Sequence, residues 1–200
     1  GLPSPHPRLP LARYFFFPGF GPDTGGLLKE AGLDARRDRF RADLHAQAAF
    51  WHALGFAPPD EAAMAVSLFG YENPAVQGLL QAWAEGDRAV VAAVPAGRLR
   101  PQVAQFFATG SVADGSVLRR GRLEARFLPF MPQARYDELL WACDWNFVRG
   151  EDSFVRALWA ARPLIWHIYP QAERAHWAKL DAFLDAYCEA LEPEPAGALR

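Results

Sequence analysis

Cysteine is scarce in this sequence, with only Cys143 and Cys188 among 200 residues. The two form no CxxC pair and no closely spaced framework, so the spacing does not indicate a disulfide-stapled protein. We expect both to be small buried side chains in a reducing compartment. His52 and His176, on predicted helices, have no metal-ligand partners nearby in the sequence, and we predict no metal site and no cofactor.

Long apolar runs and a strong charge of either sign are also missing. No stretch approaches the roughly 18 uninterrupted apolar residues of a membrane-spanning helix, and the N-terminus lacks the pattern of a signal peptide. The net charge is -2, which gives no general reason to expect nucleic acid or a membrane surface as a partner. We therefore expect a soluble, cytoplasmic protein.

An initiator methionine is absent as well. The chain opens on Gly1 and a proline-rich stretch that runs to Pro10. Such a stretch is typical of an extended connection rather than the start of a domain. We expect the sequence to be an interior piece of a longer protein.

The sequence does contain a regular alternation of strand-like and helix-like segments after residue 61. Expected strands cover 63–69, 89–94, 122–127, 145–148 and 164–168, and expected helices cover 74–84, 101–108, 136–143, 154–159 and 173–190. Strands that alternate with helices at this spacing predict an α/β fold, in which helices cover both faces of a parallel sheet.

The flanking segments are less regular. The aromatic run 14–17 favours a strand, and apolar residues at steps of three and four predict one amphipathic helix over 34–54. Four arginines near the start of that helix, Arg36, Arg37, Arg39 and Arg41, form either a solvated face or a surface for an acidic partner. We expect residues 192–200 to be a frayed tail.

Right-handed crossovers would place the loops after all parallel strands at one edge of the sheet, where α/β folds bind ligands. The polar and aromatic residues of these loops are Phe69, Tyr71, Glu72, Asn73, Pro129, Phe130, Pro132, Gln133, Arg149, Glu151, Asp152, Ser153, His167, Tyr169, Pro170 and Gln171. Aromatic rings can stack on a planar base and an arginine can hold a phosphate, so this set favours a nucleotide. Packing alone could still explain Phe69 and Phe130, and His167 is expected to be structural.

The stretch 145–156 is the most informative part of this edge. An apolar strand breaks at Gly150, and Asp152 or Ser153 then offers an N-cap for the helix that follows. Free amides and the positive dipole end of such a helix attract anions, and Arg149 adds a fixed charge. On these residues alone the segment is either a phosphate site with a carboxylate, Glu151, beside it, or simply a well-capped turn.

Several motifs in one order carry a resemblance to a known family. They are FFFPGF at 15–20, TGGLL at 24–28, VSLFGYENP at 66–74, LPFMPQ at 128–133, WACD at 141–144, NFVRGEDSFVRA at 146–157 and WHIYPQ at 166–171. On these motifs the chain resembles, almost from end to end, the bacterial EarP family of protein-arginine rhamnosyltransferases, which modify translation elongation factor P.

The resemblance implies a GT-B glycosyltransferase, in which two Rossmann-like domains face each other across a cleft. It implies an inverting, metal-independent transfer of L-rhamnose from TDP-β-L-rhamnose to an arginine of elongation factor P. Residues 1–60 would be the end of the acceptor-side N-terminal domain, and 61–191 the donor-binding domain. The donor residues carried over by motif are Phe69, Tyr71, Phe130, Gln133, Arg149, Asp152, Ser153 and Tyr169, with Phe130 at the thymine, and Glu151 is the catalytic glutamate.

The chain departs from the family in one respect. Family members carry an Asp-Asn-Phe-Gly-Asp-like motif in the N-terminal domain, whose aspartates include the expected general base, and these residues do not contain it. A guanidinium is protonated at neutral pH and is a poor nucleophile, so a carboxylate is needed. We expect this chain alone to be inactive. The alternatives are another GT-B nucleotide-sugar transferase, or a non-catalytic remnant that binds a nucleotide or a partner protein.

Overall fold

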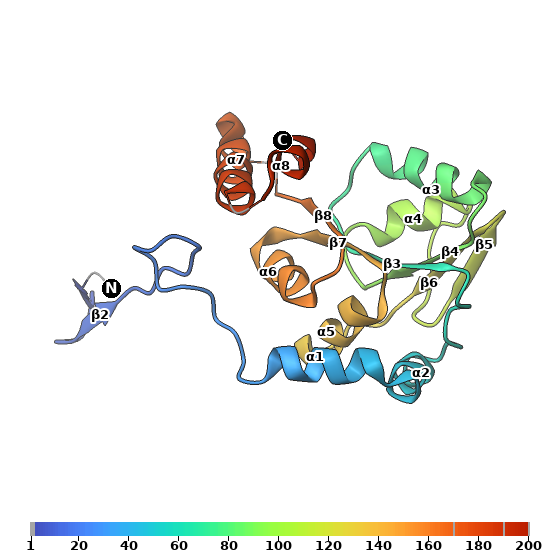
Figure 1. Cartoon of the computed structure of the whole chain (residues 1–200), viewed down its shortest axis with the longest axis horizontal. Coiled ribbons are helices and arrows are strands. Elements are labelled where there is room, and N and C mark those ends of the chain that lie inside the picture. Colours follow the sequence, from blue (N-terminus) through green and yellow to red (C-terminus); the bar gives the residue numbers. More distant parts are fainter. Residues whose placement is uncertain (1–2, 170, 190, 200) are drawn as a thin grey trace. The chain divides into compact units, whose positions relative to one another are not determined.

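The computed structural model describes residues 3–169, 171–189 and 191–199. Its larger compact unit, residues 34–173, is built on a six-stranded sheet with the order β5-β6-β4-β3-β7-β8 (Figure 1). The strands are β3 (Met64–Leu68), β4 (Val90–Val94), β5 (Val117–Arg120), β6 (Leu123–Phe127), β7 (Trp145–Arg149) and β8 (Leu164–His167). All neighbouring pairs are parallel except β5 and β6. The predicted α/β class is confirmed.

The strand sequences explain their places in the sheet. β4 is Val-Val-Ala-Ala-Val, and all five of its residues are buried, as expected for a central strand covered on both faces. β8 lies at one edge and none of its residues is fully buried. The strand β5 was not predicted, because its polar sequence Val-Leu-Arg-Arg carries no continuous apolar run and it pairs on one side only.

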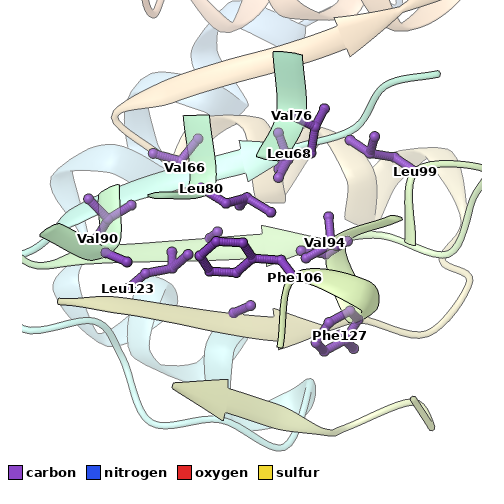
Figure 2. Packing of buried hydrophobic residues seen from close by; sticks show 14 residues of the cluster. Val66, Leu68, Val76, Leu80, Val90, Val94, Leu99, Phe106, Leu123 and Phe127 are labelled. Carbon is purple, nitrogen blue, oxygen red and sulfur yellow. The ribbon is translucent and has the colours of Figure 1, made fainter. Parts of the chain in front are cut away.

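Helices cover the two faces of the sheet. Against one face pack α3 (Ala75–Glu85) and α4 (Arg100–Phe106), and their side chains interlock with alternate strand residues in one apolar cluster (Figure 2). The members labelled there are Val66, Leu68, Val76, Leu80, Val90, Val94, Leu99, Phe106, Leu123 and Phe127. Two further helices, α5 (Gln133–Ala142) and α6 (Gly150–Ala160), pack on each other and contact β3, β7 and β8.

The single helix predicted for 34–54 is two helices, α1 (Leu33–Ala42) and α2 (Leu44–Ala53). The break falls at Asp43, whose backbone is extended at φ -111° and whose carboxylate accepts the Ala46 N–H at 3.0 Å. This N-cap satisfies one of the free donors at the start of α2, so a local hydrogen bond outweighs helix continuity.

The smaller compact unit comprises residues 1–33 and 174–200. Its described part contains a short hairpin of β1 (Pro3–Pro5) and β2 (Ala12–Tyr14), and the helices α7 (Ala175–Cys188) and α8 (Pro193–Leu199). A short 3-10 helix, Ala172–Arg174, precedes α7.

Two predictions for this smaller unit were wrong. The aromatic run 14–17 is not a strand, because β2 ends at Tyr14 and the three phenylalanines after it are exposed and irregular. The described tail residues form α8 where fraying was expected. The predicted domain boundary at residue 61 stays a prediction. Within the described residues, no helix is both long and apolar enough to cross a bilayer.

Candidate functional site

The strand order creates a crevice between β3 and β7. From β3 the chain moves to β4 and β6 on one side of the sheet, whereas β7 and β8 lie on the other side. The loops after β3 and β7 therefore diverge, and such a switch point is where open α/β sheets bind ligands. A pocket of about 480 Å³ lies there, and it is lined by Phe69, Tyr71, Arg98, Arg149, Gly150, Glu151, Asp152, Ser153 and Tyr169. This volume falls in the range of small-molecule sites.

Arg149, the last residue of β7, supplies a positioned cation. Its guanidinium carbon lies 4.3 Å from the ring centre of Phe69 and 5.0 Å from that of Tyr71. Cation–π attraction to two rings restrains the side chain without using its N–H donors. Those donors remain suited to bind oxygens of an anion.

The first turn of α6 adds backbone donors beside Arg149. The helix begins at Gly150, so the prediction that Asp152 or Ser153 is the N-cap was wrong. The capping position is held by Arg149, and Gly150 has a left-handed φ of +60°, which favours glycine because it has no Cβ. The first amides of a helix have no partner within the helix, and the residues of this first turn, Gly150, Glu151 and Asp152, line the pocket.

The side chains of this turn divide into two kinds. Glu151 and Asp152 are exposed at the pocket, whereas Ser153 is only 8% exposed. The Ser153 hydroxyl accepts the Arg149 N–H at 3.0 Å and donates to the Arg149 carbonyl. Ser153 therefore fixes the backbone that carries Arg149, while the two carboxylates can reach a bound molecule.

An aromatic group forms another wall of the pocket. The Tyr71 ring lies edge-on to His167 at 5.4 Å and to Tyr169 at 5.3 Å between ring centres. The Tyr71 N–H donates to Nδ1 of His167 at 3.2 Å. Burial lowers the pKa of His167, which keeps the imidazole neutral and Nδ1 able to accept. This histidine thus holds the loop after β3, in the structural role that the sequence favours.

Beneath the pocket, Phe69 packs edge-on against Tyr136 of α5, with 5.6 Å between ring centres. Burial raises the pKa of the Tyr136 phenol, so this ring stays neutral at physiological pH. The Phe69 ring thus contacts the Arg149 guanidinium and the Tyr136 ring, and the contact with Tyr136 helps to fix its position.

The structure brings together seven of the nine site residues predicted from the sequence. They are Phe69, Tyr71, Arg149, Glu151, Asp152, Ser153 and Tyr169. Phe130 and Gln133 do not line the pocket; they follow β6, which β4 separates from β3, a distance of about 10 Å at normal strand spacing. Phe130 is 87% exposed. Pro170 lies outside the described residues.

Arg98 was not predicted from the sequence, and Gly150 was identified only as the residue at which the strand breaks, although both line the pocket. Arg98 lies in the loop after β4, so the rule that gathers the loops after parallel strands could have found it. Other loop residues named from the sequence have different roles: the Asn73 side chain accepts the Ala75 N–H at 2.9 Å at the start of α3. Within the described residues, no cluster of three or more His, Cys, Asp or Glu side chains could hold a metal ion.

Comparison with known proteins identifies the family to which this chain belongs. The model of the family described as elongation factor P (EF-P) rhamnosyltransferase EarP matches residues 1–200. The chain belongs to the EarP family. The resemblance seen in the sequence motifs is thereby confirmed.

Curated EarP relatives extend the match over nearly the whole chain. A protein-arginine rhamnosyltransferase of Pseudomonas aeruginosa is 50% identical over 190 residues, which is 95% of this chain and 50% of the relative. One of Pseudomonas putida is 48% identical over 201 residues, which is 100% of this chain and 52% of the relative. The chain therefore spans about half the length of these relatives.

A solved structure agrees with the EarP assignment. It concerns EarP-mediated arginine glycosylation of translation elongation factor EF-P, and it is 43% identical in sequence with a TM-score of 0.81. The similarity covers 92% of this chain and 58% of that chain. The fold described above is thus the fold of this family.

Proposed function

We propose that this chain is the donor-binding half of an inverting GT-B protein-arginine rhamnosyltransferase. Its donor is TDP-β-L-rhamnose, and its acceptor is an arginine side chain of translation elongation factor P. The observation that carries the proposal is the switch-point pocket, where Arg149 lies beside the open amides of α6. Family membership supports the sugar and the acceptor.

The diphosphate of the donor fits the polar part of the pocket. Charge-assisted hydrogen bonds from a guanidinium and from helix amides are the usual way in which proteins hold phosphate. Arg149 would bind the diphosphate, with Asp152, Ser153 and Tyr169 close to it. The donor needs no metal in this arrangement, because arginine and the helix dipole supply the positive charge.

The thymine would lie away from the diphosphate, toward the end of β6. Phe130 presents a ring that is 87% exposed, and base-to-ring stacking is worth about 1–3 kcal/mol. Gln133, the first residue of α5, offers an amide for the edge of the base. A nucleotide that spans the edge of the sheet from β7 to β6 would contact both groups of predicted residues.

The chemistry follows from the acceptor. The bond between the sugar C1 and the TDP oxygen breaks, while a guanidinium nitrogen of the acceptor bonds to C1 from the opposite face. Negative charge that develops on TDP would be stabilised by Arg149 and the α6 amides. The attacking nitrogen must lose a proton, which requires a carboxylate. Glu151 would act on the acceptor or the sugar, and the general-base aspartate is expected outside these residues.

Calorimetric titration tests the proposal. We expect TDP and TDP-rhamnose to bind this chain more tightly than UDP-sugars or GDP-sugars do. If a purine nucleotide bound best, the donor would be a different one. Mixing the chain with the N-terminal half of an EarP relative, the part that this chain does not span, should restore transfer of rhamnose to elongation factor P. A mixture that transfers no sugar while TDP still binds would favour a non-catalytic nucleotide-binding module.

A further inference from the structure

Arg98 is the second arginine of the pocket, and neither the sequence motifs nor the donor residues carried over from the family include it. It is an exposed residue of the loop between β4 and α4, and it lines the pocket together with the first residues of α6. We propose that Arg98 is a second cationic contact for the diphosphate of the donor. This inference rests on the proposed function of the pocket.

The residues on either side of Arg98 lie close to the loop after β3. A Cβ placed on Gly97 would lie 3.1 Å from the Phe69 ring and 3.8 Å from Nη2 of Arg149. Leu99 is 4% exposed, and one of its methyl groups would lie 3.3 Å from a Cβ placed on Gly70. Arg98 therefore sits between two residues that are anchored on the loop after β3. Arg98 and Arg149 line the same pocket.

The side-chain charges of the pocket leave room for a second cationic contact. Its lining contains two arginines, Arg98 and Arg149, and two carboxylates, Glu151 and Asp152. A diphosphate adds negative charge to a lining that already contains two carboxylates, and a second arginine would offset part of it. With Arg98, the lining contains as many arginines as carboxylates. The positive end of the α6 dipole then makes the electrostatic potential of the pocket favourable for an anion.

Arg98 is also available to a ligand. Within the described part of the chain, its side chain has no hydrogen bond and no ion pair. Its near neighbour Arg100 differs, because it forms an ion pair with Asp114 at 2.5 Å and donates to the Leu128 carbonyl at 3.4 Å. The Arg100 guanidinium thus uses donors in contacts within the protein, whereas the donors of Arg98 are available to bind phosphate oxygens.

Calorimetry with TDP tests the assignment directly. Replacing Arg98 by Ala should weaken TDP binding roughly 10- to 100-fold, as expected for one charge-assisted contact. Arg98→Lys should keep part of the affinity, because the charge remains but the planar fork is lost. Thymidine, which has no phosphate and is followed by NMR shifts, should bind the Arg98→Ala variant as it binds the unaltered chain.

Arg122 supplies the matched control. It is an exposed arginine next to the start of β6, at the opposite edge of the sheet. Arg122→Ala removes the same charge from the protein and should leave TDP binding within about twofold.

Each other outcome decides between the hypotheses. If Arg98→Ala bound TDP like the unaltered chain while Arg149→Ala did not, the role of Arg98 would be refuted and the proposed function would stand. Equal losses for thymidine and TDP would mean that Arg98 shapes the base site instead. If the unaltered chain failed to bind TDP, the proposed function itself would fall, and this inference with it.

Discussion

The two ends of α6 are built for different tasks. At the amino end, Glu151 and Asp152 are exposed and line the pocket. Further along, Arg156 is only 7% exposed, and its guanidinium pairs in bidentate fashion with Asp137 of α5, with Nε 2.6 Å from Oδ1. The same guanidinium lies 5.3 Å from the ring centre of Trp159.

The carboxyl end of α6 is bound by another helix. The carbonyl of Trp159 accepts Arg37 Nη1 at 2.7 Å, and the carbonyls of Ala160 and Ala161 both accept Arg41 Nη2. Helix ends leave their last carbonyls without partners inside the helix, and cations are stabilising there. Two arginines of α1 thus satisfy this end, while residues of the first turn at the other end line the pocket.

This difference separates stability from binding along one helix. Substitutions that remove polar contacts of the carboxyl half should lower the free energy of unfolding and leave nucleotide affinity nearly unchanged. Substitutions at the amino end should weaken nucleotide binding and leave the free energy of unfolding nearly unchanged.

The largest effect is expected from Asp137→Ala. It would leave the buried Arg156 guanidinium without its carboxylate, which costs about 3–5 kcal/mol of unfolding free energy. Urea unfolding followed by circular dichroism measures this loss. The double variant Asp137→Leu with Arg156→Met removes both charges and should recover most of the stability. A double variant as unstable as the single one would mean that the pair matters for more than charge compensation.

Arg149→Ala should have the largest effect on binding. Loss of one charge-assisted contact weakens TDP binding roughly 10- to 100-fold. The contacts with the two aromatic rings are also lost, but each is worth only about 0.5–1 kcal/mol near the surface. The circular dichroism spectrum should stay that of a folded protein. Unchanged TDP affinity in a folded variant would place the diphosphate elsewhere.

Arg41→Ala should lower the free energy of unfolding by about 1–2 kcal/mol, because two carbonyls at the end of α6 lose a charged donor. Burial lowers the pKa of the Arg41 guanidinium, which agrees with its place in the interface between α1 and α6. Arg39→Ala is the matched control, since Arg39 is an exposed residue of the same helix and its removal should change stability by less than about 0.5 kcal/mol. Equal losses in the two variants would argue against a specific cap.

The sequence predicts the parts of this fold that depend on local pattern. The strands β3 and β4 are almost continuous apolar runs, interrupted only by Ser67, and such runs identify central parallel strands. In β6 and β7 the apolar residues are interrupted by charged or amide side chains. The rule that gathers the loops after parallel strands then brings seven predicted residues into one pocket. Nothing local marks β5, because an edge strand with two arginines obtains its order from its partner β6.

Strand order and long-range polar contacts cannot be predicted from the local sequence pattern. Phe130 and Gln133 were expected at the same nucleotide as Arg149, and the order of the strands places them beyond β4, away from the residues that line the pocket. The arginine cluster of α1 was expected to face solvent or an acidic partner. Arg37 and Arg41 instead meet carbonyls more than a hundred residues away in the chain, and a helix end offers no charged residue that a sequence pattern could reveal.

The smallest effect, and one of opposite sign, is expected from Ala161→Gly. Ala161 follows the last turn of α6 in a left-handed conformation, with φ 48° and ψ 49°, which is strained for a residue with a Cβ. Glycine at this position should raise the free energy of unfolding by about 0.5–1 kcal/mol. The same substitution at Ala157, a buried position inside α6, should instead cost about 1 kcal/mol or more. Neither change should move TDP affinity by more than about twofold, because both lie away from the open amides. If Ala161→Gly destabilised the protein, the Cβ of Ala161 would contribute packing that outweighs its backbone strain.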